Sequence, residues 1–279
     1  MRFGITMFAT DVAMDVGDLA VEAEARGFDS LWIPEHTHIP ISRLTPPPTG
    51  DAELREEYKR TVDPIVALAV AAARTERIHL GTGVLLPAQR DPIVTAKAVA
   101  TLQNAAAGRF ELGVGFGWNV DEMEDHGVEY RTRRSRTREH IRCMQSLWND
   151  EVASFDGEFV RLPPSWSWPK PERPVPVLIG GGAGPVLFEH LAEYADGWIP
   201  IGGAGLAESI PRYLEALEAA GRDPSTARIV PFGSLPDAPK LEHFESIGVT
   251  ECVFRVPSGP ADEVLPILDQ QATLIRSIS

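Results

Sequence analysis

Strand-like and helix-like segments alternate along the whole chain of 279 residues, and this alternation constrains the fold more than any other sequence feature. Apolar runs rich in β-branched residues predict buried strands, and the segments between them space their apolar residues as helices do. Eight strands are expected, at Arg2–Phe8, Phe28–Ile33, Arg77–Leu85, Arg109–Val114, Val175–Ile179, Gly197–Ile201, Arg228–Phe232 and Val249–Val256. Helices are expected after them, at Asp15–Arg26, Pro64–Thr75, Pro92–Ala106, Ser135–Asn149, Pro185–Tyr194, Leu206–Ala220, Pro239–Ser246 and Asp262–Ile275.

Eight strands that are each followed by a helix are typical of the (β/α)8 TIM barrel, an α/β fold of roughly 250 residues. We therefore predict a single barrel domain that spans residues 1–279, with a doubly wound open sheet as the alternative. Several predicted helices begin near a proline and stop just before a glycine, as at Gly27, Gly108, Gly221 and Gly248, which is the usual chemistry of helix ends.

Two connections are longer than ordinary loops. Thr37–Arg60 follows the second strand, so it is predicted to extend over the carboxyl ends of the strands as a candidate lid. Glu151–Pro174 precedes the fifth strand and contains two alternating runs around Asp156 and Gly157, which predict a hairpin insertion. Its proline-rich end, residues 163–174, is not expected to form regular structure.

Composition excludes several classes of function. The chain has 26 Lys and Arg against 40 Asp and Glu, a formal net charge of −14, which argues against binding nucleic acid. No apolar run of about 18 residues and no signal peptide are found, so we expect no membrane partner and a cytoplasmic protein. Cys143 and Cys252 are interpreted as buried hydrophobic residues of a reducing compartment.

The predicted strand ends carry most of the candidate functional residues, as a barrel requires. Gly180–Gly184 directly precedes a predicted helix and is the best candidate for binding a phosphate, although a tight turn alone would also explain its glycines. His36 follows the second strand and is a candidate proton donor or acceptor, unless it only bonds to backbone. His36 and His38 also suggest a metal site, but the later strand ends lack ligands, and no metal is predicted.

Five arginines fall within Arg131–Arg138, which raises the possibility of an anion site. Five acids precede them between residues 121 and 129, and we favour neutralisation of the arginines by these neighbours.

Six segments, in order, resemble the luciferase-like superfamily: WIPEHTHIP, TERIHLGTGVLLPAQRDPIVTAKAVATL, GRFELGVGFGWNVDEMEDHGV, SFDGEF, VPVLIGGGAGP and DGWIP. They are similar in particular to its short branch of oxidoreductases that use the deazaflavin coenzyme F420. The resemblance covers nearly the whole chain. It implies a (β/α)8 barrel, bound F420, a homodimer, and hydride transfer between C5 of the deazaflavin and a small organic substrate.

The resemblance also implies roles for individual residues. His36 stands where related enzymes keep a histidine beside C5, and Gly83–Val84 matches a strand bulge with a cis peptide bond behind the deazaflavin ring. The residues implied to contact the cofactor are Thr82, Gly83, Val84, Gly115, Gly180, Gly181, Gly182, Ala183 and Gly184. Three more, Trp118, Asn119 and Trp198, are implied to line the pocket of the cofactor ring or of the substrate.

The chain departs from the family at one position. Sugar-phosphate dehydrogenases of the superfamily carry a second acid/base glutamate just after the glycines of the fourth strand, where this chain has Trp118. Glu35 is therefore our candidate for the second proton-transfer residue, and Arg43 or Arg90 for orienting an anionic substrate. The alternatives to an F420-dependent oxidoreductase are an FMN-dependent luciferase-like monooxygenase and a protein that binds a flavin or deazaflavin without turnover.

Overall fold

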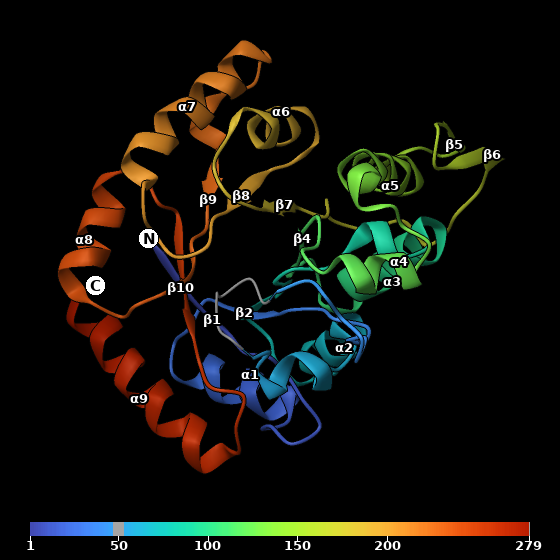
Figure 1. Cartoon of the computed structure of the whole chain (residues 1–279). Coiled ribbons are helices and arrows are strands. Elements are labelled where there is room, and N and C mark those ends of the chain that lie inside the picture. The colour runs from blue at the N-terminus through green and yellow to red at the C-terminus, as the bar shows by residue number, and fades with distance from the viewer. Residues whose placement is uncertain (47–52, 279) are drawn as a thin grey trace.

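A ring of parallel strands surrounded by helices forms the molecule (Figure 1). The computed structural model describes residues 1–46 and 53–278, and within them it confirms the predicted α/β barrel. The strands neighbour one another in the order β10, β11, β1, β2, β3, β4, β7, β8, β9. Their bounds are β1 Arg2–Thr6, β2 Ser30–Ile33, β3 His79–Thr82, β4 Phe110–Val114, β7 Val177–Gly180, β8 Gly197–Ile199, β9 Arg228–Ile229, β10 Phe232–Ser234 and β11 Glu251–Arg255.

The ring closes through β9 and β10, which together replace the seventh predicted strand. β9 pairs with β8, β10 pairs with β11, and Val230 and Pro231 lie between them. Pro231 has no N–H to donate, so it interrupts the ladder. Phe232 restores the pairing, because it forms a bridge with Ile201 and its N–H donates to the carbonyl of Pro200 at 2.9 Å.

The predicted helices all form. Their bounds are α1 Val16–Ala25, α2 Pro64–Arg74, α3 Pro92–Ala105, α5 Arg133–Asn149, α6 Pro185–Tyr194, α7 Leu206–Ala219, α8 Ala238–Ser246 and α9 Ala261–Ile278. Aspartates cap the first turns of α1, α2, α3 and α8. The carboxylates of Asp63 and Asp91 accept hydrogen bonds from Val66 N and Val94 N. A proline follows each of these aspartates, which explains why α2 and α3 begin where they do.

Two segments differ in part from the prediction: the one that follows β4 and the one that follows α5. The short helix α4 (Val120–Asp125) follows β4 and was not expected. The predicted hairpin is confirmed as β5 (Ala153–Asp156) and β6 (Arg161–Ser165), which lie outside α5 (Figure 1). The expectation of no regular structure after it is wrong at Pro163 and Pro164, which belong to β6; an edge strand tolerates prolines because its outer N–H groups need no partner.

The inside of the barrel is filled by apolar side chains beneath the carboxyl ends of the strands. Trp32 is fully buried there and its ring lies 5.2 Å from that of Phe232. Gly81 makes room for this indole, since a Cβ at position 81 would lie 2.1 Å from Trp32. This packing supports the floor of the site described below.

A charged cluster fills the opposite end of the barrel. The buried carboxylates of Glu111 and Glu251 are shared by Arg2 and Arg228, and Nδ1 of His79 lies 3.0 Å from Glu111. Burial alone would raise the pKa of Glu111, but His79 and the two arginines outweigh it and hold the pKa at about 2.

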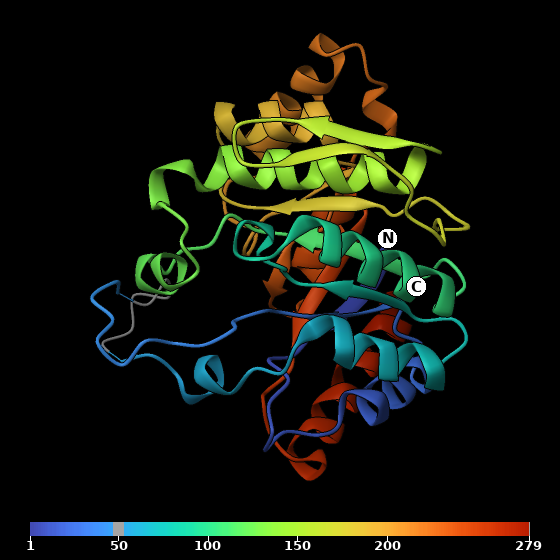
Figure 2. The same ribbon diagram turned by 90° about the vertical axis from the view of Figure 1, so that its right-hand side faces the viewer.

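The segment after β2 and helix α4 lie on one side of the barrel, opposite the marked chain ends (Figure 2). The candidate lid Thr37–Arg60 is therefore at the expected face, although residues 47–52 of it lie outside the described residues. Its last turn is a 3₁₀ helix, Glu56–Arg60. None of the helices in the described part of the chain is long and apolar enough to cross a membrane.

Candidate active site

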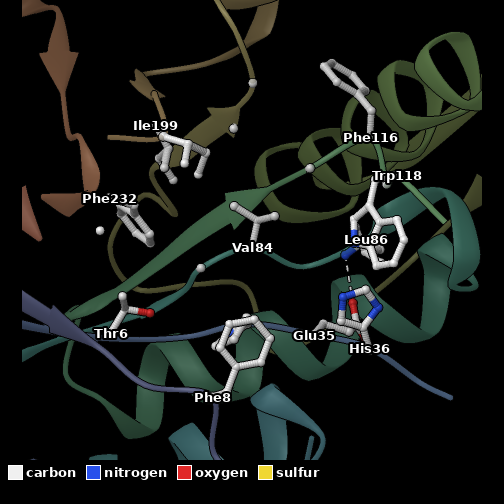
Figure 3. Close-up of a pocket in the computed structure, with 18 of the residues that line it drawn as sticks. Thr6, Phe8, Glu35, His36, Val84, Leu86, Phe116, Trp118, Ile199 and Phe232 are labelled. Carbon is white, nitrogen blue, oxygen red and sulfur yellow. Dashed lines mark hydrogen bonds between the residues drawn. The ribbon is translucent and has the colours of Figure 1, made fainter. Parts of the chain in front are cut away.

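The carboxyl ends of the strands enclose a cavity of about 630 Å³. Of the residues predicted from sequence, eight line it: Glu35, His36, Gly83, Val84, Gly115, Trp118, Gly180 and Gly181. Figure 3 shows Val84 pointing into the space between Phe232 and Ile199 on one side and His36 and Trp118 on the other. The cavity thus has an apolar end and an end that carries His36.

His36 combines burial with one ring nitrogen that faces no protein partner. Its side chain is 7% exposed, and Nδ1 lies 2.8 Å from Oε2 of Glu122 on α4. The other oxygen of Glu122 accepts a hydrogen bond from Thr37 N at 3.1 Å. Within the described residues Nε2 has no hydrogen-bond partner, so this nitrogen is available to a ligand in the cavity.

Aromatic rings surround His36. The ring centroids of Tyr58 and Trp118 lie 5.4 and 5.7 Å from that of His36, and Phe8 lies 4.7 Å from Tyr58. Tyr58 comes from the 3₁₀ helix that ends the candidate lid. These rings border the histidine with apolar surface and limit the access of water to it.

Glu35 also lines the cavity, and its carboxylate is held by Arg90. Its carboxylate accepts hydrogen bonds from Leu86 N at 2.7 Å, drawn in Figure 3, and from Arg90 Nε at 2.6 Å. Arg90 Nη2 also pairs with Asp63 at 2.5 Å. Burial raises the pKa of the Glu35 carboxyl, and the ion pair with Arg90 opposes that rise. Arg90 does not line the cavity, because its guanidinium is occupied by these two acids.

The cis peptide bond implied by the family resemblance is present. The peptide bond between Gly83 and Val84 is cis, and both residues line the cavity. Thr82, just before them, does not line the cavity: its hydroxyl is buried and donates to the carbonyl of Gly113 at 2.7 Å. Thr82 therefore ties the end of β3, just before the cis peptide bond, to the neighbouring strand β4.

The glycine turn after β7 reaches the cavity only with its first two residues. Gly180 and Gly181 line it, whereas Gly182, Ala183 and Gly184 lie beyond its wall. Trp198 is also outside the wall, since its buried indole packs between Phe188 and Tyr213 and its N–H donates to the Gly181 carbonyl at 2.8 Å. Trp198 thus holds the glycine turn from behind.

Two arginines of α5 form a cationic part of the cavity, and the expected neutralisation by nearby acids is wrong for them. Arg133 and Arg134 both line the cavity, and among the described residues neither has an ion pair. Nε of Arg133 and Nη1 of Arg134 are buried without a partner. Burial, together with the charge of Arg133, lowers the pKa of Arg134. Three acids of α4, Asp121, Glu122 and Asp125, contact the segment after β2 instead.

Two other predicted residues lie near the cavity but not on its wall. Arg43 lies with its guanidinium carbon 6.0 Å from the Trp118 ring and donates to the Thr45 carbonyl. Asn119 is 2% exposed, and both polar atoms of its side chain have no partner in the described structure. No group of three or more potential metal ligands is found in residues 1–46 and 53–278.

Several lining residues were not predicted from the sequence: Thr6, Phe8, Tyr58, Leu86, Phe116, Arg133, Arg134, Ile199, Ile201, Phe232 and Arg255. Most of them stand at or just after a strand end, and that position was a usable signal. Glu122 was also missed, since only the fold reveals that it contacts His36.

Comparisons with known proteins agree with this architecture. A sequence model of the family described as luciferase-like monooxygenase matches residues 1–236. An uncharacterised protein of Mycobacterium tuberculosis is 42% identical over 98% of each chain. The F420-dependent glucose-6-phosphate dehydrogenase of Kineococcus radiotolerans is 36% identical over 74% of this chain and 59% of its own length.

A solved structure has the same fold at low sequence identity. An F420-dependent secondary alcohol dehydrogenase, in complex with an F420–acetone adduct, superposes with a TM-score of 0.81. The two chains are 20% identical, and the match covers 100% of this chain and 99% of the other. This likeness extends the fold assignment to the whole described chain.

Proposed function

The chain belongs to the luciferase-like monooxygenase family, and we propose that it is an oxidoreductase that transfers hydride between C5 of coenzyme F420 and a small organic substrate. Relatives named as F420-dependent dehydrogenases support this choice of coenzyme. The observation that carries the proposal is the cavity, whose wall combines His36 with two arginines that have no acidic partner among the described residues.

The lining residues fit a ligand that carries a phosphate and an aromatic ring. The unpartnered nitrogens of Arg133 and Arg134 are charged donors, which pair strongly with phosphate oxygens. Gly180 and Gly181 add bare backbone shortly before α6, where the helix dipole favours an anion. Val84, Ile199 and Phe232 give the apolar surface that a ring requires. We propose that these two regions hold the phosphate and the ring of the coenzyme.

The deazaflavin, when bound, supplies hydride exchange at C5. His36 exchanges the accompanying proton: it takes the proton of a substrate hydroxyl in oxidation and returns one to the carbonyl oxygen in reduction. Nε2 is the nitrogen that serves this exchange, because Nδ1 is engaged by Glu122. Trp118 and Tyr58 flank the imidazole ring of His36 and limit the water that could compete with substrate for the proton on this ring.

We also propose that the substrate is not a sugar phosphate. Trp118 places an indole beside His36, at the position where the resemblance puts a glutamate in sugar-phosphate dehydrogenases. Arg255, which lines the cavity, is paired with Glu57. Arg43 already donates to Thr45. A substrate phosphate near His36 would have to displace one of these contacts, whereas a neutral alcohol or carbonyl compound would not.

Anaerobic turnover tests the proposal. Oxidised F420 is offered with a panel of secondary alcohols, and reduced F420 with ketones, aldehydes and enones, while the absorbance of the coenzyme is followed. We expect turnover with at least one compound and a fall of about 10²–10⁴ in the variant His36→Asn. Turnover that requires oxygen and FMN would instead indicate a monooxygenase. Binding of F420 with no exchange across the panel would indicate a protein that only sequesters it.

A further inference from the structure

We propose that Glu122 is a positioning residue that holds a proton on Nδ1 of His36 and thereby leaves Nε2 as the nitrogen that exchanges protons with substrate, a role that rests on the proposed function. Glu122 is fully buried on α4, and its contact with His36 joins residues 86 positions apart in the chain. Neither composition nor the family resemblance assigns it a role.

The hydrogen bonds around Glu122 determine where the proton lies. Thr37 N can only donate, and it donates to Oε1 at 3.1 Å. Oε2 lies 2.8 Å from Nδ1 of His36. An ionised carboxylate can only accept, and imidazole is more basic than a carboxylate. The shared proton therefore lies on Nδ1, so that neutral His36 has its lone pair on Nε2.

The surroundings keep this pair in place. The hydroxyl of Thr61 donates to the carbonyl of His36 at 2.7 Å. Asp121, the neighbour of Glu122, accepts hydrogen bonds from Leu44 N at 3.1 Å and from the hydroxyl of Thr45 at 2.7 Å. Helix α4 is thus fastened to the segment after β2 beside the His36 contact, and the backbone of His36 is held by Thr61, which keeps Glu122 within reach of Nδ1.

Fixing the tautomer determines which proton transfer neutral His36 can make at Nε2. As the substrate loses hydride from carbon to F420, the proton of its hydroxyl passes to the lone pair on Nε2, and a carbonyl group forms. In the reverse direction the imidazolium returns that proton to the carbonyl oxygen as hydride arrives. With the proton on Nε2 instead, neutral His36 could not accept the hydroxyl proton.

Glu122→Gln tests this role in the protein without coenzyme. The single oxygen of the glutamine side chain must accept from Thr37 N, so its NH₂ group faces Nδ1 and requires a lone pair there. We expect the tautomer of neutral His36 to switch, with the proton on Nε2. Nitrogen-15 NMR of protein labelled at histidine reads this directly, with the His36 signals identified from His36→Asn.

Asp125→Asn is the matched control. Asp125 lies on the same helix and also contacts a histidine, since its Oδ2 lies 3.0 Å from Nε2 of His38, but this pair is exposed and outside the cavity. We expect this variant to keep the His36 tautomer and the turnover of the wild type. Glu122→Asp, which retains two acceptor oxygens, should recover part of any loss seen in Glu122→Gln.

Kinetics provide the second readout, on any alcohol of the panel that is oxidised. Glu122→Gln should lower kcat by about 10²–10⁴ while the Kd for F420 stays within about twofold, because Arg133 and Arg134 are unchanged. An unswitched tautomer in a folded Glu122→Gln protein would overturn the role of Glu122, and so would a switched tautomer with normal kcat. Failure of the wild type to bind F420 would overturn the proposed function and leave the NMR result to stand separately.

Discussion

Replacing Arg134 should weaken the binding of an anion without lowering the stability of the protein. Arg134 lies on α5 with Nη1 buried and unpartnered, and its guanidinium carbon is 4.6 Å from the ring of Phe116. Arg134→Met keeps the apolar contact with Phe116 and removes the charge. Arg134 is half-buried and has no ion pair among the described residues, so its charge adds little to stability, and the protein without ligand should unfold at the same temperature as the wild type or higher.

The same variant should bind F420 more weakly. A hydrogen bond to a charged group contributes about 1.5–3 kcal/mol, and each 1.4 kcal/mol is a factor of ten in Kd. Loss of one phosphate contact therefore predicts a Kd roughly 10- to 150-fold higher, measured by fluorescence titration. Arg138→Met is the control, since Arg138 is exposed on the same helix and already pairs with Glu193 at 2.8 Å. Equal affinity of the wild type and Arg134→Met would refute the assignment of an anion site to Arg134.

Three further predictions follow from contacts in the barrel. Arg90→Met leaves the buried carboxylate of Glu35 without its ion pair, so the free energy of unfolding at pH 7 should fall by about 3–5 kcal/mol, as measured by urea denaturation; a change under 1 kcal/mol would contradict this. Glu111 has a folded pKa of about 2, below its unfolded value of 4.5, so its stabilisation is complete above pH 4.5 and is lost as the pH falls towards 2; Glu111→Gln should flatten that part of the stability profile. Glucose 6-phosphate should not reduce F420 in the presence of this enzyme, given Trp118 beside His36, and turnover with it at a rate similar to the best alcohol would disprove the proposed substrate class.

The helices and most of the strands were predictable because capping residues and apolar patterns in the sequence agree with the fold. Asp63 and Asp91 each precede a proline and a helical pattern, and the helices begin there as expected. The seventh strand was predicted as one run although Pro231 divides it, since an apolar pattern does not report a missing N–H. Helix α4 has six residues, which is too short for a periodic pattern to be recognised.

The site was predictable only where strand ends supply it. His36 was identified because it follows a strand at the face where barrels build active sites, and Gly83 and Val84, just after β3, were identified through the family resemblance. Glu122 and Arg134 were not, because their roles depend on which partner each charged side chain meets. The acids before Arg131–Arg138 looked like partners in the sequence, but Asp121 and Glu122 contact the segment after β2 instead.

Binding of coenzyme to the purified protein tests the proposed function most directly. The protein is titrated with F420 and, separately, with FMN, and the absorbance or fluorescence of each is followed to saturation. We predict micromolar or tighter binding of F420, weakened in Arg134→Met, and weaker or no binding of FMN. Micromolar binding of FMN with no detectable binding of F420 would contradict the proposal.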